Sequence, residues 1–184
     1  MPYSSKRNAY GRLGPLHYAV LKRDCDDVRD QLQYGVDVIE KNRDGDTALH
    51  MLRHPRKRIS SRDAALTVEK WDEECTKLEK DIIRQLSSAD KRCFHAQDAA
   101  GNTPLMSCIK ARESINNFNV IMALMEREFE DSMHKNKLDP KVDFDILNNE
   151  NESALDLAFA YGRSDILKVI CVYHFRKSHA VSVI

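Results

Sequence analysis

The sequence predicts an all-α protein in which pairs of helices repeat along the chain as a solenoid, with a tight turn before each pair. The first observation is a motif, clearest at residues 42–50 (Asn-Arg-Asp-Gly-Asp-Thr-Ala-Leu-His), that joins a tight turn to a capped helix start. The motif recurs at residues 14–19, 98–105 and 148–158. The second observation is that another apolar segment with helical spacing follows each copy, at residues 28–32, 82–86, 120–125 and 166–170. Units of this kind cannot bury an apolar face alone, so they must stack on one another.

The chemistry of the motif explains why each copy should start a helix. Gly45 accepts a positive φ that residues with a Cβ resist, and it therefore favours a tight turn. Thr47, Thr103 and Ser153 can each accept hydrogen bonds from the free N–H groups of the helix that follows. The first copy has Gly14 in place of this cap, although the proline after it still presets φ for a first helical residue.

The four copies resemble the ankyrin repeat, whose pattern is a turn with Gly, then Thr-Pro-Leu-His, then two antiparallel helices. The resemblance extends over residues 9 to 175 of the single domain 1–184. It implies an all-α curved solenoid whose inner helices line a concave face and whose short β-hairpin tips project from one edge. It divides the chain into repeats at 9–41, 42–95, 96–145 and 146–175, followed by a tail at 176–184.

The resemblance gives two histidines a structural role. His17 and His50 stand at the family's His position, where the side chain bonds to backbone near the neighbouring turn. Met106 and Asp156 occupy this position in the other two copies, so we expect the bond to be missing or altered there.

The second and third repeats are longer than the first. Equivalent residues of successive motifs lie 33, 56 and 50 residues apart, at Pro15, Ala48, Pro104 and Ala154. The insertion of the second repeat falls at residues 53–75, and apolar residues with helical spacing predict a second helix of about six turns that ends near residue 86. We expect the lengthened second helices of these two repeats to pack side by side on the convex side.

Trp71 in the lengthened helix has three interpretations. It could fold back over the preceding loop, or it could be a core residue between the two long helices. It could also form, with Val68 and Cys75, an exposed stripe that binds a partner, because an aromatic anchor on an amphipathic face is a common hot spot.

A basic segment precedes this helix. Residues 53–62 contain five basic side chains and a histidine, including Arg56, Lys57 and Arg58. The segment can be a solvated loop, a docking patch for an acidic partner, or a nuclear-import or phosphorylation segment around Ser60 and Ser61.

Composition limits the function. The 184 residues carry 29 Lys and Arg against 29 Asp and Glu, so no overall field favours nucleic acid or an anionic membrane. The five cysteines are odd in number and are not spaced as a metal or redox pair, which favours reduced thiols and a cytoplasmic or nuclear protein. No stretch approaches the roughly 18 apolar residues of a membrane span. We therefore expect no metal, cofactor, nucleic acid or membrane partner.

The sequence favours binding over catalysis. It has no Gly-rich phosphate loop, no His-Glu-x-x-His and no Gly-x-Ser-x-Gly. A cysteine-dependent hydrolase is the alternative from another class, and Cys93 with His95 would be its closest pair. From the resemblance we expect a protein-interaction module that acts as a regulatory subunit or inhibitor of a protein kinase complex. A protein that masks a transcription factor, as the inhibitors of the Rel family do, and a scaffold or pathogen effector are the alternatives.

The resemblance also indicates which residues would contact a protein partner. The tips offer Arg43, Asp44 and Asp46 at the first, Gln97, Ala99 and Asn102 at the second, and Asn149, Glu150 and Glu152 at the third. The inner helices offer Tyr18, Met51, Ser107, Lys110, Leu157 and Tyr161. The insertion of the second repeat adds Arg56, Lys57, Arg58 and Trp71.

Overall fold

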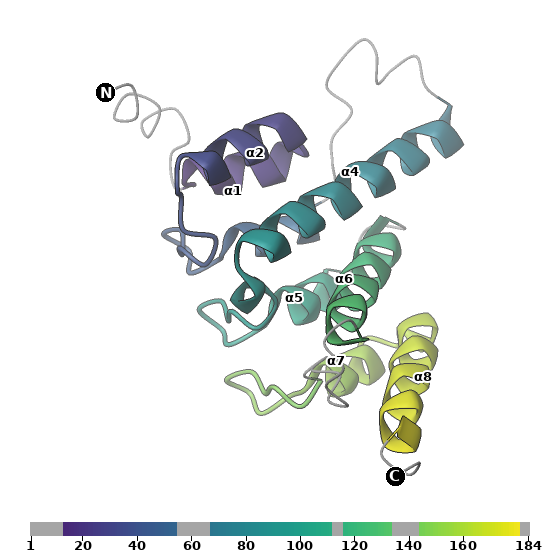
Figure 1. Ribbon diagram of the computed structural model, residues 1–184. Helices are drawn as coiled ribbons and strands as arrows, with labels where there is room; N and C mark the ends of the chain where they lie inside the picture. Colours follow the sequence, from purple (N-terminus) through teal and green to yellow (C-terminus); the bar gives the residue numbers. More distant parts are fainter. Residues whose placement is uncertain (1–12, 55–66, 112–115, 134–143, 181–184) are drawn as a thin grey trace.

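The computed structural model describes residues 13–54, 67–111, 116–133 and 144–180, which form helices joined by turns, without a β-strand. Within these residues the helices come in four consecutive pairs (Figure 1). Their bounds are α1 Pro15–Lys22 and α2 Cys25–Gln33, the 3-10 helix η2 Ala48–Arg53 and α4 Val68–Ala89, α5 Pro104–Lys110 and α6 Asn116–Met133, and α7 Ala154–Ala160 and α8 Ser164–Ala180. A short 3-10 helix, η3 (Lys91–Phe94), follows α4.

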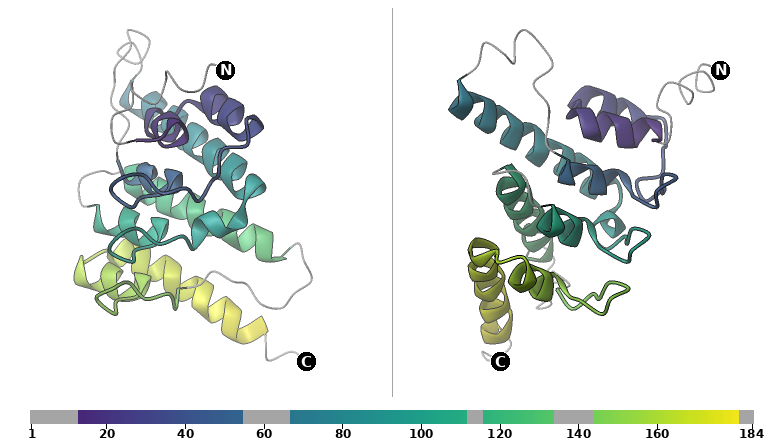
Figure 2. Two further views of the ribbon diagram at one scale, coloured as in Figure 1. Left: turned by 90° about the vertical axis from the view of Figure 1, so that its left-hand side faces the viewer. Right: turned by 180° about the vertical axis from the view of Figure 1, so that it is seen from behind.

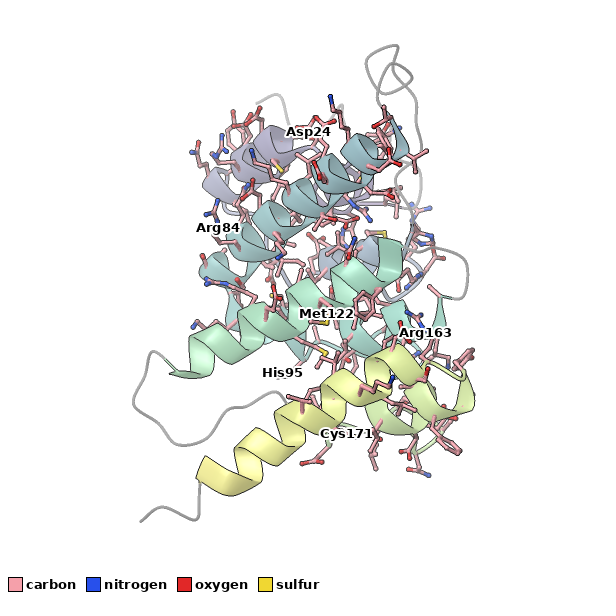
Figure 3. All side chains as sticks on the ribbon, turned by 90° about the vertical axis from the view of Figure 1, so that its right-hand side faces the viewer. Asp24, Arg84, His95, Met122, Arg163 and Cys171 are labelled. Atoms are coloured by element: carbon pink, nitrogen blue, oxygen red, sulfur yellow. The ribbon has the colours of Figure 1, made fainter. Side chains whose placement is uncertain are left out.

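The pairs are arranged in two layers. The first helices of the pairs form the inner layer and pack in series, α1 on η2, η2 on α5, and α5 on α7. The second helices form the outer layer, in which α4 packs on both α2 and α6 (Figure 3). Loops at residues 42–46, 98–102 and 148–152 project one above another from one edge of the inner layer (Figure 2). This is the stacking of helix–turn–helix units that the repeated motif predicts.

A continuous apolar core lies between the layers. Side chains from both layers meet in it and are almost completely buried, among them Leu16, Leu49, Leu52, Ile82, Ile83, Leu86, Met106, Ile109, Ile121 and Leu124. Burial of one side chain of this size contributes roughly 1.5–3 kcal/mol to folding. Because these contacts join successive pairs, no pair is expected to be stable alone. None of the described helices is both long and apolar enough to cross a membrane.

The caps at the helix starts follow the sequence. Thr103 Oγ1 accepts a hydrogen bond from the backbone N–H of Met106 at 3.3 Å. At η2 a side chain completes the cap, because His50 Nδ1 accepts the N–H of Thr47 at 3.2 Å. Gly14 starts α1 without a side-chain cap, as its lack of a side chain requires.

One expectation about local structure is corrected. The hairpin tips are turns and not paired strands. In the first of them Asn42 N donates to Asp46 O at 2.8 Å, and the Asn42 side chain accepts the N–H groups of Asp44 and Asp46. The first helix of the second repeat is a 3-10 helix of six residues. It ends at Arg53, and His54 is already extended because the residue after it is a proline.

The two long outer helices pack against each other as expected. α4 has 22 residues, about six turns, and α6 has 18. Hydrogen bonds of 3.1 Å join Asn119 of α6 to Thr76 of α4, and Arg127 of α6 to Ser87 of α4. Lys80 of α4 forms an ion pair with Glu126 of α6 at the same distance.

Trp71 does not form an exposed stripe. It is 5% exposed and Cys75 is 1% exposed, whereas Val68, the first residue of α4, is 62% exposed. The helical spacing is as predicted, but it directs Trp71 and Cys75 inward and leaves only Val68 at the surface. The basic side chains of Arg56, Lys57 and Arg58 lie outside the described residues.

Candidate functional site

Three loops with the same geometry, which we call the first, second and third tips, form the edge of the inner layer at residues 42–46, 98–102 and 148–152. The first residue of each tip accepts the N–H groups two and four residues later on its side-chain oxygen at 2.8–2.9 Å. Each turn is completed by a residue with positive φ, namely Gly45, Gly101 or Asn151. Because these bonds lie within each tip, its shape does not depend on a partner.

The second and third tips are joined to each other. Asn149 donates its backbone N–H to Ala100 O at 3.0 Å and its side-chain Nδ2 to Ala99 O at 3.1 Å. Gln97 donates to Gly101 O at 2.6 Å and to Leu147 O at 2.9 Å. Gln97 and Asn149, which were predicted to contact a partner, therefore use their side-chain amides within the protein.

Two buried histidines connect the first two inner helices, α1 and η2, to the first and second tips. His17 Nε2 donates to Asp46 O at 2.8 Å, and His50 Nε2 donates to Asn102 O at 2.9 Å, since a carbonyl can only accept. His50 Nδ1 accepts the N–H of Thr47, so the neutral tautomer satisfies both ring nitrogens. Burial lowers the pKa of both histidines below the ordinary value of 6.5. This is the role in backbone bonding that the sequence predicts for them.

Acidification should therefore destabilise the protein through these histidines. Their folded-state pKa lies below the unfolded value of 6.5, so the unfolded chain binds protons first. The stabilisation is complete above pH 6.5 and is lost as pH falls from 6.5 through the folded-state pKa. His50→Gln should reduce the change in unfolding free energy between about pH 8 and about pH 5. His95→Gln, at an exposed histidine (Figure 3), is the control and should leave that change as in the wild type.

A groove of about 460 Å³ opens between the first and second tips, over the ends of η2 and α5. Six of the residues predicted to contact a partner line it, namely Asp44, Asp46, Ala99, Asn102, Ser107 and Lys110. Asp44 and Ala99 are exposed and Lys110 is half-buried, whereas Asp46, Asn102 and Ser107 are buried in the groove wall. The predicted residues of two tips and one inner helix thus meet at one place.

Fixed charges line the groove. Asp46 and Arg53 form a bidentate ion pair with N–O distances of 2.6 and 2.8 Å. Asp98 accepts the Ser107 hydroxyl at 3.1 Å. Burial alone would raise the pKa of Asp98, but hydrogen bonds from Asn102 hold this pKa below its usual value, so Asp98 is ionised at neutral pH. The groove therefore presents positioned charges and hydrogen-bonding groups suited to a polar ligand.

The groove is also lined by Arg53, His54 and Asp98, which were not among the residues predicted to contact a partner. Asp98 occupies the first position of the second tip, where it could be recognised only as a turn residue. Arg53 and His54 belong to the basic segment in the sequence. In the structure Arg53 is the last residue of η2 and His54 follows it, and both line the groove beside the tips.

The other predicted residues lie at the rim or away from the groove. Arg43, Asn149 and Glu150 are exposed on the tips and Glu152 is half-buried. Tyr18 on α1 and Tyr161, which follows α7, are half-buried, with Lys22 Nζ 5.3 Å from the centre of the Tyr18 ring. Met51 and Leu157 are core residues, 2% and 1% exposed, because the apolar face of each inner helix packs against its neighbours. Trp71 belongs to the outer layer.

The cysteines are free thiols, and burial makes those at the centre unreactive. Burial raises the pKa of Cys108 to about 12 and also raises the pKa of Cys25. Cys93 is completely buried. Protonated, buried thiols are poor nucleophiles. In the part of the chain that the structure describes, no three His, Cys, Asp or Glu residues are grouped so that they could hold a metal ion.

No family model matches the chain, and no curated protein matches it. Among solved structures, the chain is similar to EF0377, described as an ankyrin repeat protein. The two are 18% identical, the match covers 87% of this chain and 80% of that chain, and the TM-score is 0.43. This identity is too low for any function to be transferred.

Proposed function

We propose that this protein is a non-catalytic protein-interaction module, built as one domain of four ankyrin repeats, and that a segment of its partner binds in the groove. The observation that carries the proposal is the convergence of polar side chains from two tips and two inner helices on a space of about 460 Å³. This position, between the tips and the inner helices, is the one that the resemblance to the ankyrin repeat implies for partner contacts.

The lining of the groove suits a segment of a polypeptide. Its wall contains the Asp46–Arg53 ion pair, the Asp98 carboxylate and Lys110, groups that can pair with charged side chains and backbone amides of a peptide. Charged groups are found mostly toward the rim of protein interfaces, and exposed Arg43 on the first tip extends the polar surface beyond the groove.

For the partner, we propose a protein kinase or its complex, which the protein would regulate in the cytoplasm or nucleus. The support is the resemblance, because ankyrin proteins of this size include kinase regulators. The equal numbers of acidic and basic residues give no support to a nucleic-acid partner.

Selection of peptides from a random library against the purified protein tests the groove. Asp44→Lys and Lys110→Glu each reverse a charge on a side chain that is not fully buried, so neither is expected to unfold the protein. Each substitution should lower the affinity of the selected peptides by about tenfold or more, as measured by isothermal titration calorimetry. Arg84→Glu reverses a charge on the exposed face of α4 (Figure 3) and should leave the affinity unchanged.

The same experiment can contradict the proposal. Peptides that keep their wild-type affinity for both groove variants would exclude the groove as their binding site. An equal loss of affinity in Arg84→Glu would indicate a general effect of charge and not a contact in the groove.

A further inference from the structure

Arg23 has an unusual backbone conformation for its residue type. It ends α1 with φ 58° and ψ 36°, in the left-handed region. Glycine or asparagine usually takes this position at the end of a helix, because a Cβ is crowded there. A large residue in a conformation that Gly would adopt more easily indicates that its side chain is required. The Arg23 side chain is 0% exposed, and Asp24, the next residue, is labelled beside α4 in Figure 3.

The guanidinium of Arg23 bonds to three helices. Nε donates to Glu79 Oε1 of α4 at 3.0 Å, and this carboxylate side chain is 3% exposed. Nη1 donates to Val20 O of α1 at 3.1 Å. Nη2 donates to Leu52 O at 3.0 Å and to His54 O at 2.8 Å, where η2 ends. A single buried side chain thus fixes the end of η2 against the outer layer.

The residue between the two bonded carbonyls is Arg53. Its guanidinium forms the bidentate pair with Asp46 in the wall of the groove. The backbone carbonyl of Asp46 in turn accepts His17 Nε2 at 2.8 Å. Contacts therefore continue from α4 through Arg23 to the groove wall and the first tip.

We propose that Arg23 is a positioning residue of the groove. Together with Glu79 it fixes residues 52–54, and thereby Arg53 and Asp46, so that the position of α4 controls the affinity of the groove for its partner segment. The statement about affinity rests on the proposed function, whereas the positioning can be measured without a partner. Any molecule that binds α4 and shifts it would change the groove by the same route.

Hydrogen exchange of the full chain, measured by mass spectrometry, tests the positioning. Glu79→Gln removes the charge but keeps an acceptor of the same size, and Arg23→Lys keeps the charge but lacks the planar fork that reaches several acceptors. Both should raise exchange in peptides covering residues 42–54 by about tenfold or more, as expected for the loss of a charge-assisted hydrogen bond. Exchange at the third tip should stay as in the wild type.

Ile83→Val is the matched control for a general loss of stability. Ile83 lies in α4 one turn after Glu79 and is 1% exposed, so its shortening loosens the core without touching the ion pair. It should not raise exchange at residues 42–54 relative to the third tip. Unchanged exchange at 42–54 in both test variants, or an equal relative rise in Ile83→Val, would overturn the positioning role.

The peptides selected against the wild type provide a second measurement. Glu79→Gln should lower their affinity about tenfold, although Glu79 lies in the outer layer and does not line the groove. Raised exchange with unchanged affinity would overturn the control of affinity and support the positioning. If the library yields no peptide for the wild type, that result counts against the proposed function. Hydrogen exchange alone then tests the positioning role of Arg23.

Discussion

Arg23→Met should lower the free energy of unfolding by about 3–5 kcal/mol, the range found when one partner of a buried ion pair is removed. Methionine leaves the buried carboxylate of Glu79 without this guanidinium, and it leaves the carbonyls of Leu52 and His54 without its donors. Because the site is almost closed to water, solvent cannot replace these bonds at low cost. Urea denaturation followed by the fluorescence of Trp71, the single tryptophan, measures the loss.

Two further variants identify the cause of this loss. Arg92 also forms an ion pair, with Asp90 at 2.6 Å, but it is 75% exposed, so Arg92→Met should change the stability little. The double variant Arg23→Met with Glu79→Leu removes both buried charges and should recover part of the stability. If Arg23→Met is as stable as Arg92→Met, the buried pair does not hold the helices together.

The helix starts and their stacking order could be predicted because they depend on local chemistry. Thr103 caps a helix wherever it precedes one, and the turn before it needs only a Gly and a side-chain acceptor. The contacts of the two buried histidines were predictable for a similar reason. His17 and His50 were expected to bond to backbone near the neighbouring turn, and they contact Asp46 O and Asn102 O.

The groove could be predicted only in part. Asp44, Ala99 and Lys110 follow from their positions on the tips and an inner helix, which the repeated motif defines. That Asp98 lines the groove depends on the distance between the first and second tips. Contacts between residues remote in the sequence determine this distance. The same limit applies to Arg23, which is one of 29 basic residues and whose partner Glu79 lies 56 residues away.

Gly101→Ala should destabilise the protein by about 2–5 kcal/mol, the sum of left-handed strain and overpacking. Gly101 has a φ of +78°, and a Cβ there would lie 2.5 Å from Asn149 Oδ1 and 2.7 Å from Asn149 N. That same N–H donates to Ala100 O at 3.0 Å, so the third tip cannot move aside without losing a bond to the second. The midpoint and slope of chemical denaturation give the change.

Gly35→Ala separates the strain from the contact. Gly35 has a φ of +75°, but no atom lies within 4 Å of a Cβ built on it. This variant should therefore lose only the strain energy, about 1–2 kcal/mol. The further loss in Gly101→Ala, about 1–3 kcal/mol, then measures the contact between the tips. Equal losses would mean that the third tip yields freely. A larger loss at Gly101 would mean that the second and third tips form one rigid edge, which a partner could bind without first ordering it.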